Sequence, residues 1–239
     1  MAINSYCIRY DYYWIQDQVK FKEVFMEKNI TRRSFLKKRI LITSAASVMV
    51  CGGSALALTY KPELEKPTNI FGESAMKNKI LVAYASKAGS TIEIANRVAE
   101  KITENDKSVD VLPVNKVEDL TAYQAVILGS AIRIGAVLPE VSKFVETNKD
   151  ILITKSLNVF VVCMTLNEDS EENRKTVSDY LEPIRKLVQP ANEGLFAGVM
   201  DLTKLNLIER LMMKSMKTQQ GDFRNWEKID NWAKEAILN

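Results

Sequence analysis

The chain has 239 residues, 46% of them hydrophobic and 26% charged, which is the make-up of a soluble globular protein with one sizeable core. The formal net charge of +3 comes from residues 1–39, with nine basic and four acidic side chains; the remaining 24 basic and 26 acidic residues offer no footprint for nucleic acid. The lack of histidine excludes Ser-His-Asp and Cys-His catalysis, and the three cysteines lack metal-site spacing, so any chemistry must come from carboxylates or a bound organic cofactor.

A pair of arginines and a long uncharged stretch mark the N-terminal region. Arg32 and Arg33 stand in the sequence Thr-Arg-Arg-Ser-Phe-Leu-Lys, and residues 40–59 after it are rich in Ala, Ser, Val and Leu. This arrangement resembles the twin-arginine export signal. A permanent membrane-spanning helix is the alternative, because about 20 apolar residues can cross a bilayer. Gly52, Gly53 and several Ser and Thr residues make the stretch only weakly hydrophobic, which favours the export signal.

The signal divides the chain into three parts. Residues 1–57 form the leader, residues 58–78 a linker with Pro and Gly, and residues 79–239 the folded domain. The twin-arginine translocon exports proteins that are already folded, often because a cofactor must be inserted first. The leader therefore predicts a domain that carries a cofactor and is exported across, or anchored to, the cytoplasmic membrane.

The sequence also predicts where the leader begins and where it is cleaved. Ala57 closes a small-x-small cleavage sequence, so that a cleaved chain would begin at Leu58. Residues 1–25 hold clustered Tyr and Trp and are unlike the short basic start of a signal. Met26 is therefore an alternative to Met1 as the first residue of the protein.

Beyond residue 79, short apolar runs alternate with amphipathic stretches. The apolar runs predict strands at residues 80–85, 109–114, 125–129, 159–163 and 195–200. Apolar residues at helical spacing predict helices at residues 92–102, 138–147, 171–188 and 226–238. Continuous apolar strands separated by helices indicate a parallel sheet covered on both faces, so we expect a doubly wound α/β fold. Ligands of such folds bind beyond the carboxyl ends of the strands, where the strand order reverses.

The first predicted strand is followed by a loop rich in hydroxyl side chains. The loop consists of Ser86, Lys87, Ala88, Gly89, Ser90 and Thr91 and opens the next helix. Backbone N–H groups at a helix N-terminus, together with Ser and Thr hydroxyls, make an anion site that suits a monophosphate. The loop matches neither the Walker sequence nor G-x-G-x-x-G. A simple capped turn is the alternative.

Two later loops belong to the same predicted edge of the sheet. Residues 129–135 place small side chains after the third strand and then Arg133 between two isoleucines. Flat apolar side chains beside backbone N–H groups suit a planar ring; a turn whose Arg only faces solvent is the alternative. Residues 165–169 offer hydroxyl, amide and backbone partners for the edges of a ring, or simply begin the next helix.

Taken in chain order, these loops resemble the flavodoxin family, and more closely its branch of menaquinone-dependent protoporphyrinogen IX dehydrogenases. The resemblance spans roughly residues 79–238 and includes the sequence Asp-Phe-Arg-Asn-Trp at 222–226. It implies a flavodoxin-like fold, with five parallel strands in the order 2-1-3-4-5, that binds FMN. By position, the FMN phosphate would lie on Ser86, Lys87, Ala88, Gly89, Ser90 and Thr91. The isoalloxazine would lie beside Ser130, Ala131, Ile132, Arg133, Ile134, Gly135, Thr165, Leu166 and Asn167.

Residues 203–217 form an extra segment before the last predicted helix. Apolar side chains share one face of this predicted helix, with lysines and arginine around it; they are Leu205, Ile208, Leu211, Met212 and Met216. Such a helix can touch a membrane surface or a hydrophobic substrate such as a quinone. Packing on the sheet with the lysines exposed is the alternative, and it is favoured because core helices share this periodicity.

Three functions follow as hypotheses. The leading one is an FMN-dependent oxidoreductase that resembles quinone-dependent protoporphyrinogen IX dehydrogenases, with menaquinone or another electron carrier as its redox partner. The second is an exported flavodoxin-like electron-transfer protein without a haem-pathway substrate. The third is a flavin-free binding domain that keeps only the fold. No side chain is assigned a catalytic or metal-binding role, because the chemistry would belong to the flavin.

Overall fold

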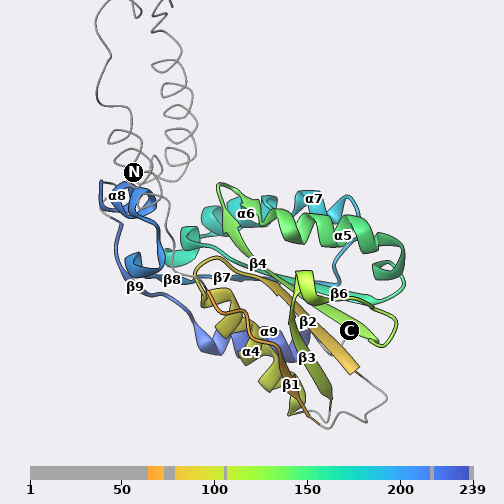
Figure 1. Cartoon of the computed structure of the whole chain (residues 1–239). Helices are drawn as coiled ribbons and strands as arrows, with labels where there is room; N and C mark the ends of the chain where they lie inside the picture. Colours follow the sequence, from red (N-terminus) through yellow and green to blue (C-terminus); the bar gives the residue numbers. More distant parts are fainter. Residues whose placement is uncertain (1–63, 73–78, 105–106, 216–217, 237–239) are drawn as a thin grey trace, which may run out of the picture.

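The computed structural model describes residues 64–72, 79–104, 107–215 and 218–236 (Figure 1). The predicted leader at 1–57, its cleavage after Ala57 and the choice between Met1 and Met26 lie outside these ranges. Much of the predicted linker lies outside them as well. Within the described ranges, no helix is long and apolar enough to cross a membrane.

One mixed sheet forms the centre of the described part. Its parallel strands are β2 (Lys79–Ala85), β3 (Ser108–Pro113), β4 (Ala125–Arg133), β6 (Ser156–Val162) and β7 (Asn192–Phe196). Across the sheet they follow the order β3, β2, β4, β6, β7. Two short antiparallel strands complete the sheet: β1 (Asn69–Phe71) pairs with β3, and β5 (Ala136–Val137) pairs with the end of β4.

Helices cover both faces of the sheet, which confirms the predicted α/β class (Figure 1). On one face lie α4 (Ser90–Thr103) and α9 (Trp226–Glu235), and on the other lie α5 (Pro139–Leu152), α6 (Glu171–Asp179) and α7 (Glu182–Arg185). Each face has its own apolar core. The sheet thus separates two layers of helices, as a doubly wound fold requires.

Strand β2 shows how the sequence produces this layering. Six consecutive residues, 80–85, are each 2% exposed or less. Alternate side chains leave opposite faces of a strand. Leu81 and Ala83 therefore enter the core under α5, α6 and α7, whereas Val82 and Tyr84 enter the core under α4 and α9. A strand buried on both faces has no polar positions, which is why its sequence is a continuous apolar run.

The structure corrects four details of the predicted elements. The sheet has seven strands, two more than expected, because three residues of the predicted linker form β1 and the chain after β4 turns back as β5. The predicted strand 195–200 lies earlier, at Asn192–Phe196. The predicted loop 129–135 is largely the end of β4 and the hairpin to β5. The predicted helix 171–188 is two helices, since α6 ends at Asp179 and Pro183 stands in the first turn of α7, where its missing N–H is tolerated.

The extra segment after β7 leaves the sheet and returns to it; we call the part from β8 to β9 the excursion. It contains strands β8 (Val199–Met200) and β9 (Gly221–Asp222), which pair antiparallel, and helix α8 (Leu207–Ser215) between them. The Phe223 N–H donates to the Gly198 carbonyl over 3.1 Å, so the chain leaves and rejoins the body at one place. The predicted extra helix is therefore present, but it is shorter than 203–217, and Leu205 precedes it as a buried residue.

Candidate functional site

The three predicted loops meet at one edge of the sheet. Ala85 at the end of β2 is the register partner of Ser130 in β4, and Ala131 is the partner of Val162 at the end of β6. The segments that follow β2, β4 and β6 therefore start side by side. Between β2 and β4 the strand order reverses, because the chain passes from β2 to β3 on one side and then to β4 on the other. Doubly wound folds bind their ligands at this kind of reversal.

The 86–91 loop leaves backbone donors without partners inside the described part of the chain. Ser86 is buried, and its Oγ accepts a hydrogen bond from the Gly89 N–H over 3.1 Å. Gly89 precedes α4 with φ 103°, a left-handed value that favours glycine, and no side chain caps the helix. The first N–H groups of a helix have no intrahelical acceptor. The turn is therefore a set of converging donors suited to an anion.

A hydroxyl in the same turn strengthens this assignment. Thr91 is fully buried, and its Oγ1 has no hydrogen-bond partner among the described residues. Leaving a buried hydroxyl unpaired costs about 1–3 kcal/mol. An acceptor such as a phosphate oxygen at the start of α4 would remove that cost. Ser90, beside it, is half-buried and lies against the chain at Gly198, where a Cβ would stand 3.2 Å from the Ser90 Oγ.

Lys87 has a partner outside the turn. Its Nζ lies 3.3 Å from Oε1 of Glu140, in the first turn of α5, and the Lys87 side chain is 44% exposed. In this arrangement the lysine charge is directed to a neighbouring carboxylate. This pair was not predictable from the sequence, because the two residues are far apart in the chain and belong to different elements.

The second segment is a rigid hairpin at the end of β4. The Ser130 side chain is buried and bridges its two strands: Oγ donates to the Ala131 carbonyl over 2.9 Å and accepts from the Leu138 N–H over 3.0 Å. Ile134 and Gly135 form the turn with φ 54° and φ 67°. Two-residue hairpin turns with the strand twist require such positive values.

Ile134 is the strained residue of the hairpin. A β-branched side chain rarely adopts a left-handed φ, at a cost of about 1–2 kcal/mol. The side chain is 59% exposed. Strained residues cluster at functional sites, so this apolar side chain, held at the loop edge, is consistent with a ligand-contacting role.

Arg133 and the half-buried Ala131 and Ile132 complete the segment. Ala131 and Ile132 pack against the core under α5, α6 and α7. Arg133 forms an ion pair with Glu209 of α8. The predicted alternative, an arginine that only faces solvent, is wrong, because this guanidinium ties the hairpin to the extra segment.

The third segment is a 3-10 turn, Met164–Asn167, after β6. Leu166 is 4% exposed and lies in the core, so its side chain is directed away from the loop edge. Thr165 is half-buried, with its Oγ1 3.3 Å from the Cys163 Sγ, and Asn167 is exposed. Of the three residues predicted here, Thr165 and Asn167 are the ones with polar side chains near the loop edge.

The 222–226 segment fastens the end of the extra segment to α4. Arg224 donates to Asp222 and to Glu93 of α4, each over 2.6 Å at the shortest contact, and its guanidinium lies 4.5 Å from the centre of the Trp226 ring. The arginine holds the pKa of the Asp222 carboxyl below its usual range by donating a hydrogen bond to it. These residues thus position the chain beside the start of α4.

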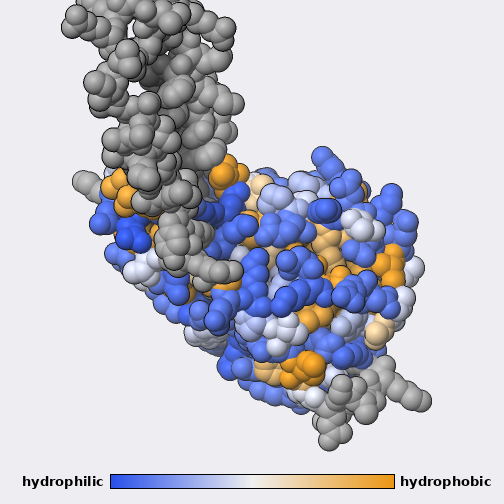
Figure 2. Space-filling model, viewed as in Figure 1, coloured by the Kyte–Doolittle hydropathy of each residue, from blue (hydrophilic) through white to orange (hydrophobic). Residues whose placement is uncertain are grey.

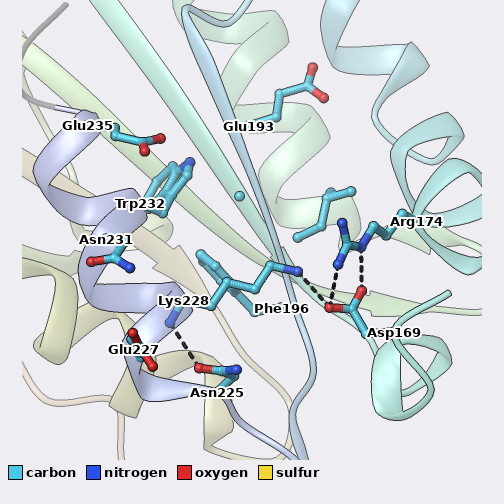
Figure 3. Close-up of a pocket in the computed structure, with 12 residues that line it drawn as sticks. Asp169, Arg174, Glu193, Phe196, Asn225, Glu227, Lys228, Asn231, Trp232 and Glu235 are labelled. Atoms are coloured by element: carbon cyan, nitrogen blue, oxygen red, sulfur yellow. Dashed lines mark hydrogen bonds and ion pairs between the residues drawn. The ribbon is translucent and has the colours of Figure 1, made fainter. Parts of the chain in front are cut away.

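A cavity of about 500 Å³ lies elsewhere, along the free edge of β7 between α6 and α9 (Figure 3). Asp169 stands in its wall and accepts from Arg174 over 2.5 Å and from Lys228 over 3.2 Å. The Arg174 hydrogen bond, with the help of Lys228, lowers the pKa of Asp169 to about 2. None of the predicted site residues lines this cavity. We place the candidate site at the loops, because the buried Thr91 hydroxyl and the uncapped start of α4 offer donors for an anion. The cavity is instead lined by side chains of both charge signs, among them Asp169, which is paired with Arg174 and Lys228.

The described ranges contain no group of three or more His, Cys, Asp or Glu side chains that is placed to hold a metal ion. The converging groups at the loop edge are N–H and O–H donors, which suit an anion.

Comparison with known proteins identifies the family of this chain. A family model described as a flavodoxin domain matches residues 81–226. A protein named protoporphyrinogen IX dehydrogenase (quinone), from Escherichia coli K12, is 24% identical over 170 residues, which cover 66% of this chain and 93% of that protein. Among solved structures, oxidised flavodoxin 1 from Bacillus cereus has 18% identity and a TM-score of 0.45 and covers 68% of this chain and 99% of its own. A Fusobacterium nucleatum flavodoxin bound to flavin mononucleotide has 13% identity and a TM-score of 0.41, and covers 67% and 97%. Because the family model spans more than half of the chain, this protein belongs to the flavodoxin domain family.

Proposed function

We propose that this protein binds FMN at the loop edge and acts as an oxidoreductase of the kind represented by quinone-dependent protoporphyrinogen IX dehydrogenase. The 24% identity to that enzyme, over 93% of its length, supports the choice of reaction class. Bound FMN would supply the redox chemistry by accepting and releasing electrons. The protein would bind it, orient it and adjust its surroundings.

The observation that carries the proposal is the donor-rich start of α4. The phosphate would lie on Ser86, Lys87, Ala88, Gly89, Ser90 and Thr91. Backbone N–H groups would hold its oxygens, and the buried Thr91 hydroxyl, unpaired within the described residues, would donate to one of them. Ser86 would act indirectly, because its Oγ already holds the Gly89 N–H and so shapes the loop.

The ring would lie against the hairpin and the 3-10 turn. This assigns it to Ser130, Ala131, Ile132, Arg133, Ile134, Gly135, Thr165, Leu166 and Asn167. The Ser130 hydrogen bonds keep the hairpin backbone in place, and the exposed Ile134 would cover part of a ring face. Leu166 could contribute only through its backbone, because its side chain is in the core.

A second candidate is an exported electron carrier without a haem-pathway substrate. The twin-arginine sequence at Arg32 and Arg33 favours it, since such a signal would place the domain outside the cytoplasm. We propose the twin-arginine translocon as a partner and cleavage after Ala57, or retention of the leader as an anchor, as the alternatives. N-terminal sequencing of the protein from membrane and periplasmic fractions distinguishes a chain that begins at Leu58 from one that keeps Met1 or Met26.

The cofactor is tested with paired variants of the full chain. Ser90→Ala and Thr91→Ala should each weaken FMN binding by roughly tenfold to a hundredfold, because each removes a charge-assisted hydrogen bond worth about 1.5–3 kcal/mol. The control is Ser142→Ala with Thr147→Ala on α5, which also removes two hydroxyls from a helix. FMN affinity follows from titration of the flavin fluorescence. A colourless purified protein that takes up no FMN would favour the third hypothesis, a flavin-free binding domain.

The reaction is tested separately on the flavin-loaded protein. Oxidation of protoporphyrinogen IX that depends on added menaquinone selects the dehydrogenase. Rapid electron exchange with redox carriers, but no protoporphyrinogen turnover, selects the electron carrier. The Ser90→Ala variant is the control in both assays, because its activity should fall in proportion to its loss of FMN.

A further inference from the structure

Helix α8 is attached to the hairpin of the candidate site. Glu209 accepts from the Asn206 N–H over 3.1 Å, while the Asn206 side chain accepts from the Glu209 N–H over 2.8 Å, which is a reciprocal cap at the start of the helix. The same Glu209 carboxylate pairs with Arg133 of the hairpin. One side chain thus both starts the helix and attaches it to the segment assigned to the ring. The helix is consequently oriented by the site rather than free to turn.

The face of α8 opposite Glu209 is apolar and exposed. Leu207 is 41% exposed, Ile208 47% and Leu211 58%. At 100° per residue these three fall within one 100° arc, and Glu209 lies outside that arc, on the side attached to the protein. We call Leu207, Ile208 and Leu211 the outer face of α8. Figure 2 shows apolar surface at the position of this helix. Ile134, next to Arg133 in the hairpin, adds another exposed apolar side chain at this end.

The charges around the outer face are positive. Lys204 and Lys214 are exposed on either side of it along the chain. The only carboxylate of the helix is Glu209, which is engaged with Arg133 and the helix start. An apolar stripe flanked by exposed lysines matches an anionic lipid surface, into which apolar side chains insert while the ammonium groups stay at the headgroups.

The described part of the chain begins at the same end of the domain. Leu64 begins the described part, and its Cδ1 lies 3.5 Å from where a Cβ on Gly89 would be, so the chain enters beside the 86–91 loop. The sequence before it contains the uncharged stretch 40–59. A leader associated with a membrane would therefore hold the loop edge, and with it α8, toward the bilayer.

We infer that the outer face of α8 docks on an anionic lipid bilayer and turns the loop edge of the domain toward it. This inference deepens the proposed function, on which its meaning rests: a flavin bound at that edge would face the phase in which a lipid-soluble quinone is dissolved. The bilayer is the partner, and α8 is the element that meets it.

The test places a polarity-sensitive fluorophore on the helix of the full, FMN-loaded chain. Leu211→Cys carries the label in a chain with Cys7→Ser and Cys51→Ser, and Ile153→Cys, which is 62% exposed at the end of α5, is the matched control. With vesicles of phosphatidylglycerol and phosphatidylcholine, the emission at 211 should shift to shorter wavelength and be quenched by brominated acyl chains. The emission at 153 should do neither.

The lysines are tested with the same label. The variant Lys204→Ser, Lys214→Ser should need a higher lipid concentration to reach half of the full emission shift, by roughly fivefold per lysine. The reason is that a basic residue near an anionic surface contributes about 1 kcal/mol to the binding free energy. Lys149→Ser with Lys186→Ser, at exposed positions of α5 and at the end of α7, should leave this lipid concentration unchanged.

Two results would overturn the inference. If the emission of the label at 211 does not change when vesicles are added, α8 does not contact lipid. A label whose emission is already at short wavelength before vesicles are added means that another part of the protein covers the outer face. FMN content is read from the absorbance of the same samples, so that a flavin-loaded protein with an unresponsive label rejects the docking alone, whereas missing flavin rejects the proposed function.

Discussion

Helices α8 and α9 begin alike and end in opposite environments. Each starts at an asparagine: Asn206 accepts from the Glu209 N–H over 2.8 Å, and Asn225 accepts from the Lys228 N–H over 2.9 Å. Both are amphipathic. Yet α9 buries Ile229 and Trp232, which are 6% exposed or less. Helix α8 instead exposes Leu207, Ile208 and Leu211, each by 41% or more.

The difference lies in what each helix finds beside it. The Trp232 ring lies 5.8 Å from that of Phe160 and 5.6 Å from that of Phe196, which leave the sheet on the face that α9 shares with α4. Helix α8 belongs to an excursion from the sheet and is attached through polar contacts of Glu209 and Arg210. Helical periodicity therefore predicts a helix and its apolar face, but not the surface that this face will meet.

The packing of Trp232 on the sheet should contribute the most to stability. Trp232→Ala should lower the free energy of unfolding by about 3–5 kcal/mol, because it removes the ring that fills the space between Phe160 and Phe196. Leu211→Ala, the control on α8, should change it by less than about 0.5 kcal/mol. Urea denaturation followed by circular dichroism measures both. Equal losses for the two variants would mean that α8 packs as tightly as α9.

A smaller effect separates the two helix starts. Asn225→Ala should lower the free energy of global unfolding by about 1 kcal/mol, since it removes the cap of a helix that is part of the core. Asn206→Ala removes the same kind of bond from α8. It should speed hydrogen exchange of the α8 amides while leaving the global value nearly unchanged, because a weakly packed helix opens locally. A global loss in Asn206→Ala would show that α8 unfolds only with the whole domain.

The smallest effect concerns pH and the attachment of α9 to α4. Asp230 receives two hydrogen bonds from Arg97, each 2.7 Å, and these hold the pKa of its carboxyl below the usual range. A lowered pKa in the folded protein means that the pair stabilises the fold fully above the ordinary Asp pKa of about 3.9, and that this contribution is lost as the pH falls through the lowered value. Asp230→Asn should lower the free energy of unfolding at pH 7 by less than the loss of the Asn225 cap does, because Arg97 is partly exposed and solvent weakens the pair.

The check on this pair is a series of urea titrations between pH 7 and pH 2. The stability curves of the variant and of the parent should converge toward the acid end. A constant gap across the series would assign the loss to packing around residue 230 and not to the charge of Asp230.

Much of this fold was predictable because it depends on local patterns. The continuous apolar run at Ile80–Ala85 predicted β2 through burial on both faces, and the spacing of Ile94, Val98 and Ile102 predicted α4. Strand β1 was not predictable in the same way. Its three residues belong to the sheet only because β3 offers a free edge, with Asn69 opposite Val111, and no pattern so short identifies a strand.

In the candidate site, too, the features that depend on local sequence were predictable and those that depend on the tertiary fold were not. The hydroxyl-rich 86–91 sequence indicated an anion site by itself, since its donors come from one turn. The ion pairs of Lys87 with Glu140 and of Arg133 with Glu209 join residues that only the tertiary fold brings together. The strain at Ile134 was also hidden, because a left-handed φ at a β-branched residue contradicts the local preference that sequence reasoning uses.

The hydrogen bond between Gly198 and Phe223 has a consequence for how such proteins diversify. Since the excursion begins and ends at this single contact, with β8 and β9 as its neck, its length and content can change without moving β7 or α9. The entry point itself is constrained: a side chain at Gly198 would stand 2.9 Å from Val162 and press toward Ser90. Segments of different length could thus be inserted beside the 86–91 turn while the turn itself stays as it is.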